Sequence, residues 1–438
     1  MTQGRAVTDS EIVITGMGVV TPIGDSVAKF WAANLAGTSG LVREYRMDLS
    51  QLPCGWVAGI IQENLKVQVA ARSGRPGRSW GDTLMHDALA QALDDADLGR
   101  PLDVQAALVW ARVWPGPSGS FPQDYPPHLE EAALRYEAAG ADQAASVEYL
   151  RGKELPGELT DSSGFQAEVA EKLGTPLQAT RLEATCSGGL RAIAEAARQI
   201  RLGEAEVAIV TASVSRSTPY VLSQYGQLMA LSRWKGEAAQ ASMPFDARRS
   251  GMVINESSGA VILETAGHAR RRAAPHAYAA VGGWGLAVGT GHVTAPDVGE
   301  VERVIRAAIA DSGLTPEDID TVNAHGTSTR LNDATEAAAL RRVFGERLAE
   351  IDVCAVKSLT GHGSAASGVI ETVAAALTLT HDVVPPVVTC TEPDPQCGVK
   401  TSLTPVARPV RTVLKCSFGF GGQYAAMVFR KPERVPAA

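Results

Sequence analysis

One cysteine of the chain lies where a thiol could act as a nucleophile. Cys186 stands in the stretch RLEATCSGGL, directly before residues with the apolar spacing of a helix. A thiol attacks as the thiolate, and the first turn of a helix favours an anion through its partial positive charge and free N–H groups. The small residues Ser187, Gly188 and Gly189 would let a substrate approach the sulfur closely. This stretch alone still favours the alternative, a buried structural cysteine.

Two histidines strengthen the case for a reactive thiol. His325 lies in NAHGTST and His362 in AVKSLTGHGSAASG, each where an apolar stretch passes into a glycine-containing loop, and Lys357 precedes His362 on the same loop. Active residues of α/β proteins gather beyond the carboxyl ends of strands. Although one loop histidine is usually only a polar loop residue, two in similar contexts among eight histidines indicate a shared site.

A glycine-rich turn near the C-terminus is a further candidate. The stretch KCSFGFGGQYAAMVF contains Phe418 and Phe420 but lacks the Lys-Ser/Thr pair of a phosphate-binding loop. A turn of this kind can instead direct backbone N–H groups at a developing oxyanion.

The elements that must position these residues alternate between strands and helices. EIVITGMGVV predicts a buried strand, followed by a helix capped by Asp25 and closed by Gly37. WGDTLMHDALAQALDDADL predicts a second helix and VQAALVWARV the next strand, while GGLRAIAEAARQIRLGE predicts a helix that begins at or just after Cys186 and ends at Gly203. This alternation is typical of parallel β-α-β units, so we expect an α/β fold.

The chain is predicted to consist of two similar halves. Residues 11–265 form the first, which carries Cys186, and residues 276–432 the second, which carries both histidines, because the order of helix, strand and glycine recurs in each. The Pro- and Gly-rich segment at about 114–164 is predicted to be a cap or loop insertion, of functional or merely decorative character.

Composition limits the function classes. The 438 residues carry a formal net charge of −8, which argues against a general nucleic-acid binder. Six cysteines without a C-x-x-C pair indicate neither a zinc site nor a disulfide framework, so no metal is expected. The first residues lack a signal-peptide pattern and no uncharged stretch is long enough to span a membrane, so we expect a cytoplasmic protein.

Six motifs in register resemble those of the β-ketoacyl-ACP synthases, the condensing enzymes of the thiolase superfamily, and in particular the elongating ketosynthases of fatty-acid and type II polyketide systems. The motifs span nearly the whole chain: VITGMGVVTPIG, ATCSGG, PFDARRSGMVINESSGAVILE, NAHGTSTRLNDATE, VKSLTGHGSAASG and SFGFGG. The resemblance implies a thiolase-like fold, in which two βαβ-type halves form a five-layer α-β-α-β-α sandwich.

The resemblance also implies roles for individual residues. By similarity, Cys186 is the acyl-accepting nucleophile, His325 and His362 handle decarboxylation and the enolate, Lys357 supports them, and Glu336 is the partner of the lysine. By the same similarity, Phe418 is the gating phenylalanine whose backbone amide forms the oxyanion hole together with that of Cys186. The residues expected to contact the substrate are Phe418, Phe420, Thr327, Thr329 and Gly419.

The implied activity is decarboxylative Claisen condensation of an acyl group on Cys186 with a malonyl-type thioester. Several positions depart from the family pattern and suggest specialised, polyketide-like metabolism: Thr185, Ser250, Asn255, Ser257 and Cys416. Two alternatives stay open at this point, a ketosynthase-like cyclase that closes a ring on a carrier-bound substrate, and a chain-length-factor subunit. Retention of the cysteine and both histidines speaks against the second, and the second histidine motif disfavours a thiolase or an initiating synthase.

The implied partner is an acyl carrier protein, which presents its substrate on phosphopantetheine, and no other cofactor is expected. Because carrier proteins are acidic, the basic stretch HARRR at 268–272 is a candidate docking patch, with an ordinary solvated turn as the alternative. The family further implies a dimer formed through the strand near AEVAIVTAS, a homodimer or a heterodimer, and no nucleic-acid or membrane partner.

Overall fold

The computed structural model describes residues 9–43, 57–74, 80–98, 102, 104–111, 163–215, 222 and 225–432. Most of the predicted insertion, residues 114–162, lies outside this part of the chain.

In the described part of the chain, ten strands form the main sheet, in two sets of five with the same topology. The first set comprises β1 (Ile12–Val20), β4 (Ala106–Ala111), β5 (Leu177–Leu182), β6 (Val207–Ser215) and β7 (Glu256–Thr265), in the spatial order β1-β7-β6-β4-β5. The second comprises β8 (Ala279–Val288), β9 (Thr321–Asn323), β10 (Asp352–Cys354), β13 (Thr412–Gly419) and β14 (Gln423–Arg430), in the order β8-β14-β13-β9-β10. In both sets the first two pairings are antiparallel and the last two parallel.

The two sets meet where β1 and β8 pair over two residues, so all ten strands are hydrogen-bonded in one series. Shorter pairings outside this series join β2 (Leu41–Val42) to β3 (Ala58–Gly59) and β11 (Val383–Val384) to β12 (Val406–Ala407).

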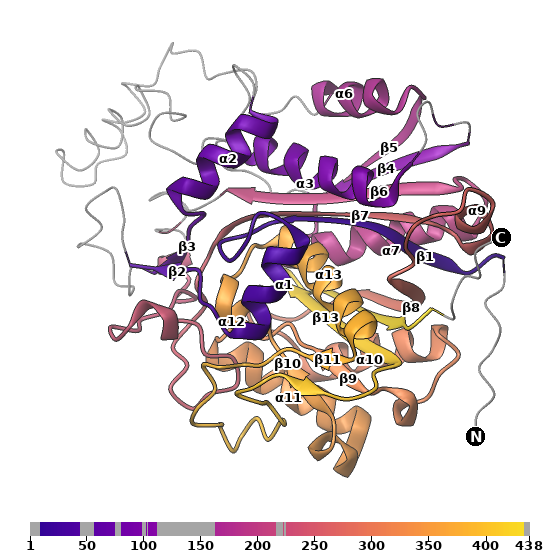
Figure 1. Cartoon of the computed structure of the whole chain (residues 1–438). Helices are drawn as coiled ribbons and strands as arrows, with labels where there is room; N and C mark the ends of the chain where they lie inside the picture. The colour runs from indigo at the N-terminus through magenta and orange to yellow at the C-terminus, as the bar shows by residue number, and fades with distance from the viewer. Residues whose placement is uncertain are drawn as a thin grey trace.

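Helices form three layers around the strands. The outer layer on the first set holds α2 (Glu63–Ser73), α3 (Trp80–Ala96) and α6 (Ser163–Leu173), and the central layer holds α7 (Gly188–Arg201) and α13 (Ala365–His381). The other outer layer holds α10 (Val298–Asp311) and α11 (Arg330–Phe344). Outside these layers, the described residues also form α1 (Val27–Ala36), α9 (Ala266–Arg271) and α12 (Lys357–Thr360). Because α7 and α13 contact strands of both sets, they form the central layer of the α-β-α-β-α succession that the family resemblance implied (Figure 1).

The central helices follow from their sequences. The stretch AASGVIETVAAALTLTH is apolar on every side and is buried from Ala365 to Leu379, as expected for a helix enclosed between two sheets. Glycine lets α7 and α13 approach closely, since a Cβ on Gly368 would lie 2.4 Å from the amide nitrogen of Leu190. This contact brings the start of α7, next to Cys186, against the start of α13, next to His362.

Two predictions about local structure are wrong. The cap of α1 is Ser26, whose side chain accepts from Lys29 N, whereas Asp25 forms ion pairs with Lys29 and Arg72. The strand near AEVAIVTAS is β6, which is paired on both sides by β4 and β7 and therefore offers no edge to a second subunit. The edge strand of the first set is β5.

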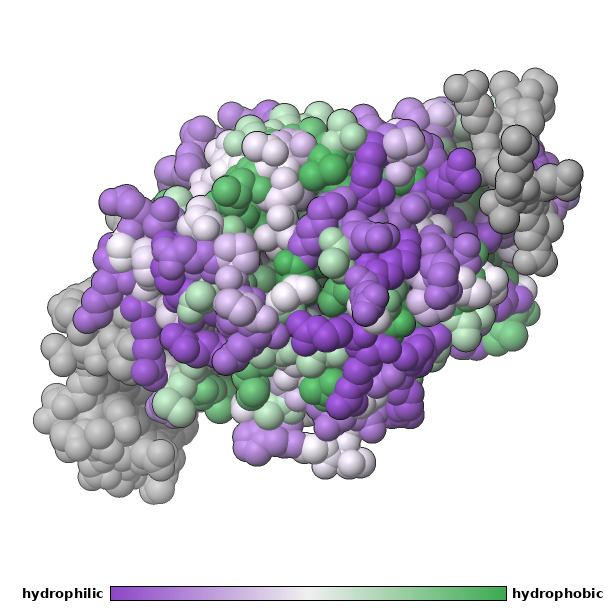
Figure 2. Space-filling view, turned by 90° about the horizontal axis from the view of Figure 1, so that it is seen from below, coloured by the Kyte–Doolittle hydropathy of each residue, from purple (hydrophilic) through white to green (hydrophobic). Residues whose placement is uncertain are grey.

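The outer face on the side of α10 and α11 is predominantly hydrophilic, with apolar side chains in separate small patches (Figure 2). Among the described helices, none combines the length and the apolar character needed to cross a membrane.

Candidate active site

Cys186 lies on a tight turn that precedes α7. The turn Thr185–Ser187 is a single 3₁₀ turn, and Thr185 has a φ of 45°, a conformation that a β-branched residue rarely adopts. The Thr185 hydroxyl donates to the carbonyl of Phe420 (3.2 Å), and the Ser417 hydroxyl donates to the carbonyl of Cys186 (3.1 Å). These two bonds fasten the strained turn to the glycine-rich turn at the end of β13, 231 residues further along the chain.

The glycine-rich turn lies directly over the cysteine. A Cβ on Gly419 would lie 2.1 Å from Thr185 Oγ1 and 3.1 Å from the amide nitrogen of Cys186, so only glycine fits there. Phe418 is buried, and its ring lies edge-on to that of His325, with centroids 5.4 Å apart. The sequence prediction that this turn belongs to the site is thus consistent with the geometry.

Charged groups hold His325 at the end of β9. Glu336 accepts from His325 N (2.7 Å) and from Gly326 N (2.9 Å), while Lys357 Nζ donates to the carbonyl of His325 (2.7 Å). The same ammonium group lies 3.4 Å from His325 Nδ1. Since an ammonium can only donate, Nδ1 accepts and the hydrogen of the neutral ring resides on Nε2.

His362 is oriented by a serine of the next helix. Ser367 Oγ accepts from Gly363 N (2.9 Å) and lies 3.2 Å from His362 Nδ1. The hydroxyl has one hydrogen and two lone pairs, so it can accept from this amide and donate to Nδ1 at the same time; we assign this orientation, which leaves the hydrogen of His362 on Nε2. The rings of His325 and His362 are 5.3 Å apart at an interplanar angle of 84°. Two buried imidazoles therefore offer two Nε2–H donors side by side.

Both imidazoles are neutral at physiological pH. Burial lowers the pKa of His325 and of His362 well below the ordinary value, and the nearby ammonium groups of Lys357 and Lys415 lower each pKa further. A neutral ring can donate from Nε2 without carrying a charge of its own.

The carboxylate that pairs with Lys357 is Glu371, so the prediction of Glu336 as the lysine's partner is wrong. Glu371 Oε1 lies 2.5 Å from Lys357 Nζ, and its Oε2 lies 2.7 Å from Lys415 Nζ. Glu336 instead binds the backbone that carries His325, and burial raises the pKa of Glu336 to about 7.

Sequence reasoning missed Glu371 and Lys415, although each carries a signal. Glu371 is the single charged residue of VIETVAAALTLT, and Lys415 is the single charged residue of TVLKCSFG. A lone charge within an apolar helix or strand is seldom left without a buried partner, because an unpaired buried charge is unstable.

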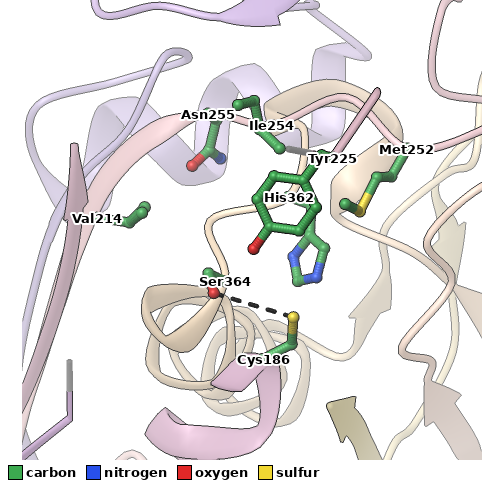
Figure 3. Close-up of a pocket in the computed structure, with 8 residues that line it drawn as sticks. All are labelled: Cys186, Val214, Tyr225, Met252, Ile254, Asn255, His362 and Ser364. Atoms are coloured by element: carbon green, nitrogen blue, oxygen red, sulfur yellow. Dashed lines mark hydrogen bonds between the residues drawn. The ribbon is translucent and has the colours of Figure 1, made fainter. Parts of the chain in front are cut away.

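The thiol and the two imidazoles face a common cavity. A recess beside Cys186 is lined by His362 and Ser364, and the Cys186 sulfur points toward the His362 ring, 3.9 Å from Ser364 Oγ (Figure 3). It adjoins a larger cavity of about 490 Å³ that is lined by Cys186, His325 and His362 together. All five residues expected to contact the substrate line this larger cavity: Phe418, Phe420, Thr327, Thr329 and Gly419.

Residues that depart from the family pattern support the loop of His362. Asn255 lines the recess, but its amide group donates to the carbonyls of Thr360 and Gly361 (2.9 and 3.2 Å) and its oxygen accepts from Ser257 (2.8 Å). Both residues thus brace the segment that ends at His362.

The basic stretch at 268–272 is not a free positive patch. Four of its side chains bind carboxylates of the chain itself: His268 and Arg272 bind Glu264, Arg270 binds Asp9 and Arg271 binds Glu206. None of these basic residues lines the cavity described above. The alternative, an ordinary turn held by ion pairs, describes it better.

The arrangement suits acyl transfer followed by enolate chemistry. A thiol at the start of a helix can accept an acyl group, and two Nε2–H donors can stabilise an enolate oxygen in a site withdrawn from water.

Comparison with known proteins gives a consistent result. Residues 130–269 match the N-terminal domain of β-ketoacyl synthases, and residues 278–391 match their C-terminal domain. The chain is 30% identical to 3-oxoacyl-acyl-carrier-protein synthase 2 of Coxiella burnetii over 96% of its length and 98% of the relative. It is 31% identical to the ketoacyl synthase alpha subunit of the tetracenomycin polyketide synthase of Streptomyces glaucescens, with 98% of each chain covered.

Solved structures include similar ketosynthases. One is the ketosynthase of a type II polyketide system, in complex with its acyl-carrier protein and bound to the hexaketide, which superposes with a TM-score of 0.79 at 28% identity over 96% of this chain and 99% of that chain. Another is the ishigamide ketosynthase/chain length factor, with a TM-score of 0.77 at 28% identity over 96% and 98% of the two chains.

Proposed function

This chain belongs to the β-ketoacyl synthase family, and we propose that it catalyses decarboxylative condensation between an acyl group on Cys186 and a malonyl-type thioester. The observation that carries the proposal is the convergence of Cys186, His325 and His362, from three distant parts of the chain, on one cavity. The polyketide relative and the departures from the family pattern at Asn255 and Ser257 support a role in specialised, polyketide-like metabolism.

In the first step, the Cys186 thiolate attacks the acyl thioester of a carrier-bound phosphopantetheine. A bond forms between the acyl carbon and the Cys186 sulfur, and the pantetheine thiolate leaves. The oxyanion formed on the way accepts from the backbone amides of Cys186 and Phe418, a role supported by the position of the turn at Gly419 over the cysteine.

In the second step, the bond between the malonyl Cα and its carboxylate breaks and carbon dioxide leaves. The electron pair passes into an enolate, whose oxygen accepts from Nε2–H of His325 and of His362. The enolate carbon then attacks the acyl carbon on Cys186, which forms the new C–C bond and releases the thiolate. Lys357 acts through His325, because it holds Nδ1 as an acceptor.

The proposed partner is an acyl carrier protein that docks where the larger cavity opens. Two arginines line this cavity, Arg233 and Arg330, and are better placed for an acidic carrier than the ion-paired residues at 268–272. Exposed apolar side chains surround them on the same lining: Leu228, Met229, Val293 and Leu331.

A homodimer through the edge strand β5 is proposed in place of one through β6, because β4 is the only strand that pairs with β5 among the described residues. The division into halves at 11–265 and 276–432 also remains a proposal, which the repeated strand order supports.

Intact-mass spectrometry tests the proposed function. The native protein and Cys186→Ala are each incubated with an acylated and a malonylated carrier protein. We expect the native protein to gain the mass of the acyl group, whereas Cys186→Ala gains no mass. We also expect the malonyl group on its carrier to be converted into a β-ketoacyl group that is two carbons longer than the acyl group loaded on Cys186. Loading without carbon dioxide release or chain growth would favour a cyclase instead, and no loading would favour a chain-length-factor role.

A further inference from the structure

A second lysine lies within the site and has no part in the reaction described so far. Lys415 is on β13, a central strand that pairs with β9 and β14, and its side chain is fully buried. Its Nζ lies 2.7 Å from Glu371 Oε2 and donates to the carbonyl of Cys416. The same Nζ lies 3.5 Å from the carbonyl of Ala324, the residue before His325.

Lys357, Glu371 and Lys415 form what we call the buried charge cluster. One carboxylate bridges two ammonium groups, at 2.5 Å from Lys357 and 2.7 Å from Lys415. Each of the three side chains is at most 2% exposed. With both lysines charged, the cluster has one positive charge more than its carboxylate can neutralise.

A second buried lysine is an unexpected choice if the strand only had to pack. Desolvation makes a buried ammonium unfavourable, and a well-packed apolar side chain is often at least as stabilising as a buried ion pair. Glu371 already has a partner in Lys357, so pairing alone does not require Lys415. Its position is better explained by the groups that its charge reaches.

We propose that Lys415 is a positioning residue for the two imidazoles. By sharing Glu371 with Lys357, it keeps the buried charge cluster positive. That charge opposes protonation of His325 and His362, so both rings remain neutral Nε2–H donors. The contacts of Lys415 do not depend on any assumed function, whereas the catalytic benefit of neutral imidazoles rests on the proposed decarboxylation.

Other titratable groups around the imidazoles do not cancel this charge. Glu336 is bound by two backbone N–H groups, and because burial raises its pKa to about 7, it offsets the second ammonium only in part at neutral pH. Burial raises the pKa of Cys354 to about 12 and raises that of Cys416 well above its ordinary value, so both thiols are neutral. Among the described residues, the titratable groups of the elements packed against the imidazoles include Lys357 of α12, Glu371 of α13, Lys415 and Cys416 of β13, Glu336 and Asp333 of α11, Cys354 of β10 and the thiol of Cys186. The recess and the cavity are also lined by Tyr225, His292, Tyr424, Arg233 and Arg330.

The test is the pH dependence of carbon dioxide release from a malonylated carrier protein, measured at saturation between pH 5 and 8. Lys415→Met removes the charge at nearly constant length, and Lys415→Gln also removes it but keeps a donor for Glu371. In the native enzyme we expect release to persist at mildly acidic pH. In both variants, the midpoint of the acidic limb should shift to a higher pH by about one unit. The reason is that the loss of a nearby positive charge makes each imidazole easier to protonate.

Lys66→Met is the matched control. Lys66 is also a buried lysine next to a glutamate, 3.8 Å from Glu256, but it does not line the cavity. Its loss should change stability without moving the acidic limb. A folded Lys415→Met enzyme with the native acidic limb would overturn the proposal.

A second measurement covers the case in which neither Lys415 variant folds. In the native protein labelled with [¹³C]histidine, the resonances of His325 and His362 are assigned from the His325→Ala and His362→Ala variants and titrated. Rings that stay neutral down to pH 5 support the proposal, and a midpoint near 6.5 for either ring overturns it. Native protein that releases no carbon dioxide while both rings stay neutral would instead overturn the proposed function.

Discussion

The pairing of Lys357 with Glu371 leads to a quantitative prediction about stability. Glu371→Gln leaves the buried ammonium groups of Lys357 and Lys415 without their carboxylate, whereas Lys357→Met breaks the 2.5 Å pair and leaves Glu371 with Lys415 alone. Removal of one partner of a buried ion pair costs on the order of 3 to 5 kcal/mol in unfolding free energy. For Glu371→Gln we expect the upper part of this range, because two ammonium groups lose their carboxylate.

A double-mutant cycle isolates the interaction. The coupling between Lys357→Met and Glu371→Gln should be about 2 to 3 kcal/mol, since residues in one ion-pair network couple at this level. The matched cycle uses Glu336→Gln, which alters an equally buried carboxyl group that binds the backbone of His325 and Gly326. The coupling between Glu336→Gln and Lys357→Met should be below about 1 kcal/mol.

Urea denaturation followed by circular dichroism measures all of these free energies, with the slope on urea compared between variants to verify a common unfolding transition. A coupling of Lys357 to Glu336 that equals or exceeds its coupling to Glu371 would refute the assignment of the lysine's partner. So would a loss of less than 1 kcal/mol in the Glu371→Gln protein.

Three further predictions concern other parts of the site and the core. Ser367→Ala should lower the rate of decarboxylation about tenfold, because His362 loses the donor that keeps its hydrogen on Nε2. The rate is measured from carbon dioxide release at saturation, and an unchanged rate would contradict the tautomer assignment. Gly419→Ala should abolish most acyl loading, because the added Cβ would lie 2.1 Å from Thr185 Oγ1. Thr185→Ala in the same chain should restore part of the loading, which is measured by intact mass. A double variant that loads no better than Gly419→Ala would show that the clash lies elsewhere. Burial opposes ionisation of Glu264, but hydrogen bonds from neighbouring side chains hold its pKa at about 2 against an ordinary 4.5. Its contribution of about 3 kcal/mol to unfolding free energy is therefore fully present above pH 4.5 and should be lost as pH falls toward 2, whereas a Glu264→Gln protein should lack this component of the acid dependence.

The helices and strands could be predicted because apolar periodicity and turn residues are local signals, whereas the five layers were implied only by the family resemblance. The strand EIVITGMGVV, the helix from Trp80 and the helix that follows Cys186 all occur where the pattern places them. The spatial order of the strands is not a local signal, and so the dimer contact inferred from the family resemblance was placed on β6, although two neighbouring strands enclose it.

The reactive groups could be found because their motifs are local, but their supporting partners could not. Glu336 and Glu371 both lie on helices near the histidines, and only the packing of α13 against the site decides which of them meets Lys357. Lys415 was overlooked because a lone lysine in an apolar strand shows its purpose only when its buried neighbours are known.

Acyl loading and decarboxylation, measured in the same samples of His325→Ala and His362→Ala, test the central claim most directly. Removal of a single donor to an oxyanion costs on the order of 10² to 10³ in rate. Both variants should therefore still acquire the acyl group on Cys186 while carbon dioxide release from the malonylated carrier falls by about that factor. Carbon dioxide release at the native rate in either variant would contradict the claim that the thiol and the two imidazoles work on one substrate.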